Sequence, residues 1–197
     1  MYNGGSMKIF KVFIYIILPA LIFLSAVFFI SLNNQKKSLP IYGSAPDFRL
    51  MERSGRQLKC DDLKGAPWIA GFIFTRCLEQ CPMIGDDMRR IMNEVEGIRL
   101  VSFSVDPNFD TPAVLSEYAK RFEADPARWF FLTGQREVLN HVTTSFHMNK
   151  IDEPMFHSAS LVLMDSKNRV RGFYDANDPE RIENLKRDAK SLMQSKN

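Results

Sequence analysis

The chain has 197 residues, of which 45% are hydrophobic and 25% are charged, and its formal net charge is +3. This balance is typical of a folded protein and excludes a large disordered portion. Lys and Arg are interspersed with Asp and Glu, so the charge does not favour a nucleic-acid-binding protein.

The N-terminal part contains a long uncharged, apolar segment between Val12 and Leu32. A helix of about 20 such residues can cross a bilayer. The alternative is a cleaved signal peptide, but the apolar region of such peptides is shorter, about 7–15 residues. We therefore predict a tail over residues 1–11, one transmembrane anchor over 12–32, a polar linker over 33–45 and one domain over 46–197.

The domain sequence shows apolar strands that alternate with amphipathic helices. Residues 68–74 form a nearly unbroken apolar run, which is typical of a central strand covered on both faces. The full prediction, in chain order, is a hairpin over 48–51 and 57–60, a strand over 68–74, a helix over 82–96, a strand over 98–105, a helix from 110–112 to about 122, a strand over 129–132, a helix over 135–146, a hairpin over 158–164 and 170–174, and a helix from 179. This order predicts an α/β domain with a central mixed sheet flanked by helices, of the thioredoxin-like type.

Two of the three cysteines, Cys77 and Cys81, lie at the junction between the predicted strand 68–74 and the following helix. Ligand sites of open α/β sheets form at the carboxyl ends of strands. The N-terminus of a helix also favours a thiolate over a thiol. Two thiolates are soft ligands that select copper(I) or zinc, and imidazole suits both ions. The pair therefore indicates a metal site with a histidine as a third ligand.

The chain has three histidines, His141, His147 and His157. His157 directly precedes the predicted strand 158–164, in a loop that a thioredoxin-like layout brings near the end of the strand 68–74. His141 lies within a predicted helix, and His147 follows that helix. We therefore expect His157 to be the third ligand, with His141 and His147 as the alternatives.

Other interpretations of the cysteines remain open. One turn of helix places the two Cα atoms about 6 Å apart, which is within disulfide range, so an inert disulfide is one alternative. A thiol–disulfide oxidoreductase is another, although its redox motif usually has the spacing Cys-x₂-Cys. A peroxidase with a single reactive thiolate is a third. Cys60, in the first predicted hairpin, is interpreted as a small buried hydrophobic residue.

The loop after the strand 98–105 contains two aspartates, Asp106 and Asp110, followed by Thr111 and Pro112. Asp110, Thr111 and Pro112 are typical of a helix start, because they supply capping side chains and a proline at the first helical position. The aspartates are expected to shape the turn and cap the helix. The alternative is that they lie close to the metal and support its ligands.

The chain resembles the SCO/SenC family over about residues 45–195. The resemblance is carried by four motifs in order: Phe74-Thr75-Arg76-Cys77-x-x-x-Cys81-Pro82, Ser104-Val105-Asp106-Pro107-x-x-Asp110-Thr111-Pro112, Leu132-Thr133-Gly134 and His157-Ser158. It implies a thioredoxin-like fold with a single N-terminal membrane anchor. It also implies copper ligands at Cys77, Cys81 and His157, and a role in assembling the copper centre of cytochrome c oxidase.

On this resemblance we expect a copper metallochaperone without catalytic residues, in the cytoplasmic (inner) membrane with its domain on the extracytoplasmic, periplasmic side. Its expected partners are the copper-receiving subunit of the oxidase and other copper chaperones or thiol reductants. In the alternative function, Cys77 and Cys81 are a redox-active pair that reduces the cysteines of that subunit. The chain departs from the family pattern at Leu78, where proline is usual, and at Phe156, where aspartate is common.

Overall fold

The computed structural model describes residues 15, 17–21, 23–25, 38–77, 80–146 and 159–194. The chain divides into two units, Met1–Ser38 and Leu39–Asn197. Within the described residues, no helix combines the length and the apolar character needed to cross a bilayer. Much of the predicted anchor over 12–32 lies outside the described residues, so the anchor stays a prediction.

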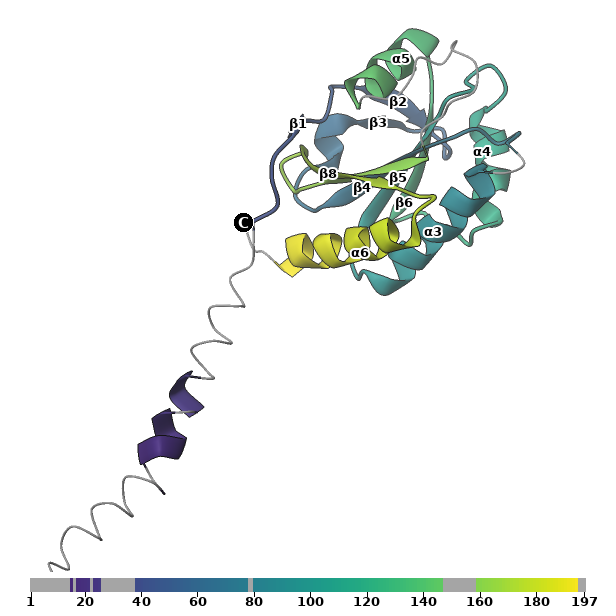
Figure 1. The fold of residues 1–197 in the computed structure, drawn as a ribbon. Coiled ribbons are helices and arrows are strands. Elements are labelled where there is room, and N and C mark those ends of the chain that lie inside the picture. Colours follow the sequence, from purple (N-terminus) through teal and green to yellow (C-terminus); the bar gives the residue numbers. More distant parts are fainter. Residues whose placement is uncertain are drawn as a thin grey trace, which may run out of the picture. The chain divides into compact units, whose positions relative to one another are not determined.

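The second unit is built on one mixed sheet (Figure 1). The strands of the described residues are ordered β1-β8-β7-β4-β5-β6-β2-β3. The strands β4, β5 and β6 run parallel, and the remaining pairs are antiparallel. Their bounds are β1 Gly43–Ser44, β2 Arg49–Glu52, β3 Gln57–Lys59, β4 Trp68–Ile73, β5 Arg99–Ser104, β6 Trp129–Thr133, β7 Ser160–Met164 and β8 Arg169–Asp175. The predicted α/β domain with a central mixed sheet is confirmed.

Helices cover both faces of this sheet (Figure 1). The helices α3 (Gln80–Glu94), α4 (Pro112–Lys120) and α6 (Pro179–Gln194) share one hydrophobic core with the sheet, on what we call the α3 side. The helix α5 (Arg136–Ser145) and the 3-10 helix η2 (Cys60–Leu63) share the other core, on the α5 side. The two cores are separated by the sheet itself.

The strand β4 shows why the sequence gives two cores. Successive side chains of a strand point to opposite faces. Ile69 and Ile73 therefore belong to the α3 side, whereas Trp68, Ala70 and Phe72 belong to the α5 side. Every residue of β4 is buried, which accounts for its nearly unbroken apolar sequence.

The local signals for the helices hold, with one correction. The hydroxyl of Thr111 accepts a hydrogen bond from the Val114 N–H at 3.3 Å, so Thr111 caps α4. Met88 and Met92 of α3 fill the core as expected. Met83, which the helical spacing also assigns to the apolar face, is instead 53% exposed. Its neighbours Cys81 and Ile84 in the same part of α3 are buried, so Met83 lies on the solvent-facing side of the helix.

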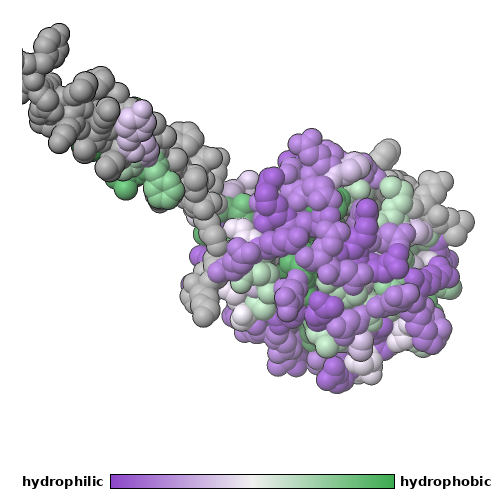
Figure 2. All heavy atoms as spheres, turned by 90° about the horizontal axis from the view of Figure 1, so that it is seen from below, coloured by the Kyte–Doolittle hydropathy of each residue, from purple (hydrophilic) through white to green (hydrophobic). Residues whose placement is uncertain are grey.

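Two strand pairings were not predicted. The strand β1 lies within the predicted linker and pairs with β8 through Gly43 and Val170. The strand β2 pairs with β6 as well as with β3. Both pairings join segments far apart in the sequence, so local patterns could not indicate them. Figure 2 shows one face of the domain, which is mostly hydrophilic with small, separate hydrophobic patches.

Candidate metal centre

The cysteine pair lies at the carboxyl end of β4. Cys77 follows this strand by four residues, and Cys81 is the second residue of α3. The end of β5 lies beside the end of β4, because the Val105 N–H donates a hydrogen bond to the carbonyl of Ile73 at 2.8 Å. The loop that carries Cys77 and the loop after β5 therefore leave the sheet side by side.

The backbone of Cys81 contacts the side chain of Cys77. The Cys81 N–H donates a hydrogen bond to the Sγ atom of Cys77 at 3.3 Å. Such a donor stabilises negative charge on sulfur. Cys77 is half-buried and packs against the α3-side core, and Cys81 is only 4% exposed within that core. Both cysteines are thiols in this structure.

The environment of Cys81 disfavours its thiolate form. Burial raises the pKa of Cys81 to about 12, and the neighbouring Cys77 adds to the increase, while a backbone hydrogen bond at Phe74 opposes it. The side chain is therefore protonated at neutral pH. It becomes a thiolate only where a positive charge compensates the burial, as a bound metal ion does.

Asp110 joins the two loops. It is fully buried and accepts hydrogen bonds from the Thr75 N–H at 3.2 Å and from the Thr75 hydroxyl at 2.5 Å. The Ser104 hydroxyl donates a third bond to it at 2.6 Å. Thr75 is two residues before Cys77. The carboxylate thus fixes the segment that leads into the cysteine pair against the end of β5.

Asp106 makes a second, more exposed connection between the same loops. Its carboxylate accepts hydrogen bonds from Arg76, with Nε at 3.1 Å and Nη2 at 2.5 Å. The Arg76 guanidinium also lies over the ring of Phe109, 4.5 Å from its centre. Asp106 and Asp110 therefore shape the turn, as expected, and connect it to the segment before Cys77. The alternative, that they lie close to a metal ion, stays a prediction. The expected capping by Asp110 is wrong, because Thr111 caps α4.

The histidines are only partly described. His147 and His157 lie outside the described residues. His141 is exposed on α5, where it lines a surface pocket with Asp47, Lys59 and Glu137. Because α5 packs on the opposite face of the sheet from α3, His141 is not brought to the cysteine pair. Among the described residues, no cluster of three or more His, Cys, Asp and Glu side chains is arranged to hold a metal ion.

Cys60 is separate from the cysteine pair. It is buried in the α5-side core, as expected, and the Asn168 amide donates a hydrogen bond to its sulfur at 3.3 Å. Burial raises the pKa of Cys60 to about 11, with the nearby Asp61 and Asp47 adding to the increase. It is therefore an unreactive thiol in the core.

Three polar residues near the pair were not predicted to belong to the site. Thr75 and Ser104 donate to Asp110, as described above. The third is Tyr118 on α4, whose hydroxyl is buried and has no hydrogen-bond partner among the described residues. Burial raises the pKa of Tyr118, and the nearby Cys81 and Cys77 add to the increase. Because Tyr118 falls on the apolar face of its helix, nothing in the sequence separates it from an ordinary core residue.

Comparison with known proteins gives a consistent assignment. A family model described as SCO1/SenC matches residues 40–194. The SCO1 protein homolog of Bacillus subtilis (strain 168) is 28% identical over 175 residues, which cover 84% of this chain and 91% of that protein.

Solved structures agree with this match. One is the structure of BsSco, which is described as a member of the Sco family of cytochrome c oxidase assembly proteins with a disulfide switch. It matches with a TM-score of 0.70 and 25% identity, and the match covers 81% of this chain and all of that chain. ScoI from Bradyrhizobium japonicum, solved with copper bound, matches with a TM-score of 0.58 and 27% identity over 73% of this chain and 98% of that chain.

Proposed function

The chain belongs to the SCO1/SenC family, and on this premise we propose that it is a membrane-anchored copper metallochaperone for the copper centre of cytochrome c oxidase. Copper is its cargo, and Cys77, Cys81 and His157 are the ligands. The observation that carries the proposal is the cysteine pair at the carboxyl end of β4, with the Cys81 N–H directed at the Cys77 sulfur. In this function the protein transfers an ion and needs no catalytic residue.

The donor set suits copper(I). Two thiolates are soft ligands, and an imidazole completes a three-coordinate site. The buried thiol of Cys81 must lose its proton for the ion to bind, so binding releases protons and strengthens as the pH rises. A three-coordinate ion can pass to an acceptor that offers better-matched ligands.

The register of the sheet supports His157 as the third ligand. The strand β7 runs antiparallel to β4, with Val162 opposite Ala70. The start of β7 therefore lies beside the end of β4, and Ala159 belongs to the same core as Ile73 and Cys81. His157 precedes Ala159 by two residues, a distance that a chain spans in at most about 7 Å between Cα atoms. The position of Ala159 at this edge of the sheet supports His157 as the proposed third ligand.

The membrane assignment is part of the proposal. We assign residues 12–32 to the anchor, 33–45 to the linker and 46–197 to the domain, which would face the extracytoplasmic side of the inner membrane. Its partners are the copper-receiving subunit of the oxidase, with other copper chaperones or thiol reductants as suppliers. The departures from the family pattern at Leu78 and Phe156 lie outside the described residues.

Copper titration of the purified full chain in detergent, under reducing conditions, tests the ligand set. We expect Cys77→Ser, Cys81→Ser and His157→Ala each to abolish tight binding of one copper ion per chain. His141→Ala and His147→Ala are the controls and should bind copper as the wild type does. X-ray absorption at the copper edge should show sulfur and nitrogen ligands. Stoichiometric copper in the Cys77→Ser/Cys81→Ser variant would contradict the proposal.

A thiol–disulfide oxidoreductase is the second candidate. One observation favours it: the Cys81 N–H lies 3.3 Å from the Cys77 sulfur, so the two side chains start close together, as a disulfide requires. The match to BsSco, described as having a disulfide switch, points the same way. The two functions differ at His157, because a dithiol reductant should keep most of its activity in His157→Ala, whereas a copper carrier should lose its function.

A further inference from the structure

A buried hydroxyl beside the cysteine pair lacks a hydrogen-bond partner among the described residues. It belongs to Tyr118, which is 4% exposed on α4. Buried polar atoms are nearly always paired, and an unpaired one destabilises the fold. An exception in a native protein calls for a reason, such as a ligand or a second state that supplies the missing partner.

The position of this hydroxyl is fixed by packing. The Tyr118 ring meets Phe122 and Phe131 edge-on, with centres 5.1 Å and 6.3 Å away. The Arg121 guanidinium lies 5.8 Å from the ring centre. Because aromatic neighbours hold the ring, the hydroxyl cannot turn out to water without disturbing the core.

The same packing places Tyr118 next to the candidate metal centre. Tyr118 and Cys81 belong to one core, and Cys77 packs against that core. Tyr118 also lines a surface pocket together with Thr75 and Arg76, the two residues before Cys77. Tyr118 is therefore held near the loop that carries Cys77.

The cysteines are where a new acceptor can arise. A thiol is a weak hydrogen-bond acceptor, whereas a thiolate, free or bound to a metal ion, is a strong one. In the dithiol form the Tyr118 O–H has no hydrogen-bond partner among the residues that the structure describes. When the sulfurs become thiolates to bind an ion, a strong acceptor appears within the same core. Small adjustments of the cysteine loop can then bring the two groups together.

We propose that Tyr118 is a positioning residue of the metal centre, whose O–H donates a hydrogen bond to a cysteine sulfur when the pair is in its metal-binding thiolate form. This inference rests on the proposed copper function. The unpaired hydroxyl destabilises the empty dithiol form, and the new bond stabilises the loaded form. Both effects favour the metal-bound form over the empty form, because the same hydroxyl raises the free energy of the empty form and lowers that of the loaded form.

The variant Tyr118→Phe tests this inference, because it removes only the hydroxyl. We expect the copper-free variant to melt at a higher temperature than the wild type. Its copper(I) affinity, measured in the full chain by competition with a chromophoric chelator, should fall by on the order of tenfold or more, the loss expected for a hydrogen bond to a charged group. With copper(II) bound, the thiolate-to-copper absorption band should move to longer wavelength, because the sulfur becomes a stronger electron donor.

Tyr174→Phe is the matched control. Tyr174 is also buried in the α3-side core, but its hydroxyl donates to Asp188 at 2.7 Å. Its removal should lower the melting temperature and leave copper affinity and the absorption band unchanged. Unchanged copper affinity and an unchanged band in Tyr118→Phe would overturn the inference while leaving the proposed function intact. Failure of the wild-type chain to bind copper would instead overturn the proposed function.

Discussion

At the scale of single residues, the two aspartates after β5 differ in burial, and we expect them to differ in their contribution to stability. Asp110 is fully buried, and its carboxylate accepts hydrogen bonds from Thr75, just before Cys77, and from Ser104 at the end of β5. Asp106 contacts Arg76, whose side chain is largely exposed. Exposed ion pairs contribute little to stability, whereas a buried carboxylate that loses its charge leaves its donors poorly satisfied.

We therefore expect Asp110→Asn to lower the free energy of unfolding by about 2 kcal/mol. It should also weaken copper binding by about 10- to 100-fold, the range found for residues that orient metal ligands. Asp106→Asn is the control and should lower the free energy of unfolding by less than about 1 kcal/mol. Chemical denaturation and copper titration of both variants measure the effects. Equal losses in the two variants would show that burial of Asp110 is not what makes it important.

The cysteines themselves should differ in reactivity. Cys77 is half-buried and receives the Cys81 N–H, whereas Cys81 and Cys60 are buried with raised pKa values of about 12 and about 11. Because only thiolates react with alkylating agents, Cys77 should be labelled first by iodoacetamide in the reduced, copper-free chain at neutral pH. Peptide mass spectrometry over time measures the order. Labelling of Cys81 ahead of Cys77 would contradict the geometry of the pair.

At the scale of elements, α3 is held close to the segment that follows α4. Gly85 lies on the buried side of α3, and a Cβ atom at this position would overlap the ring of Phe122. Cys81 lies one turn before Gly85 on the same helix. The close approach of the two segments therefore sets the position of the helix that carries a proposed metal ligand.

Gly85→Ala tests this contact. In a free helix the change would stabilise by about 1 kcal/mol, but here overpacking against Phe122 should destabilise the fold by about 1–3 kcal/mol. The double variant Gly85→Ala/Phe122→Ala should lose less than the sum of the single variants, because the overlap is gone. Thermal unfolding of the four proteins completes the cycle. A more stable Gly85→Ala protein would mean that the two segments are not in close contact.

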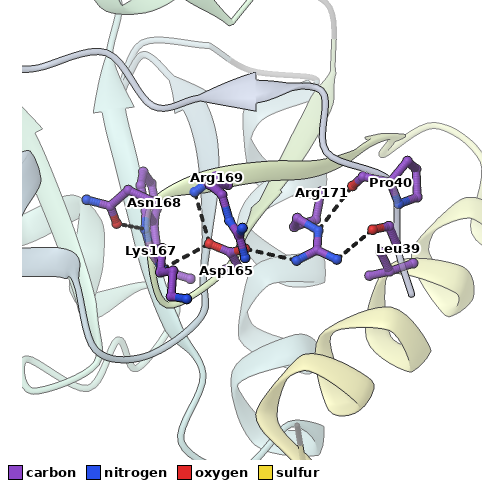
Figure 3. Close-up of polar contacts among 8 residues, drawn as sticks. Leu39, Pro40, Asp165, Lys167, Asn168, Arg169 and Arg171 are labelled. Carbon is purple, nitrogen blue, oxygen red and sulfur yellow. Dashed lines mark hydrogen bonds and ion pairs between the residues drawn. The ribbon is translucent and has the colours of Figure 1, made fainter. Parts of the chain in front are cut away.

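At the scale of the whole molecule, one buried carboxylate connects the last hairpin with the chain that enters the domain. Asp165 accepts hydrogen bonds from the backbone N–H groups of Lys167 and Arg169, and it pairs with the side chains of Arg169 and Arg171 (Figure 3). Arg171 also donates to the carbonyls of Leu39 at 2.5 Å and Pro40 at 3.0 Å. The segment leading in from the predicted anchor is thus tied to the β7–β8 hairpin.

This arrangement predicts a defined response to acid. Burial by itself raises the pKa of Asp165, but the hydrogen bonds from Arg169, Arg171 and Lys167 more than offset it, so the pKa lies below its usual value of 3.8. A carboxyl with a depressed pKa stabilises the fold above that usual value. The contribution is lost as the pH falls through the lower, folded-state pKa.

Asp165→Asn should therefore cost about 3 kcal/mol at neutral pH, because two partly buried arginines lose their partner. The difference from the wild type should shrink as the pH falls below about 3.8. Denaturation curves from pH 7 to pH 3 measure this convergence. Asp61→Asn, which removes only an exposed pair with Lys64, is the control. If the free energies of unfolding of wild type and Asp165→Asn differed by the same amount at every pH, the lowered pKa of Asp165 would be contradicted.

The sequence by itself determined the features that depend on neighbours along the chain. The apolar run of β4, the helical spacing of Met88 and Met92, the Thr111 cap and the two hairpins follow from local periodicity and turn chemistry. The position of Cys77 and Cys81 at a strand-to-helix junction follows in the same way. These features were enough to predict the α/β fold and a soft metal site.

Only the tertiary structure decided which distant segments meet. The bond from Thr75 to Asp110 joins residues 35 positions apart, and the pairing of β1 with β8 crosses most of the domain. Tyr118 looks like a core residue in sequence, and it becomes notable only because the fold buries its hydroxyl beside the cysteine pair. Burial and hydrogen bonding between distant segments depend on how the elements pack, and local sequence patterns do not determine that packing.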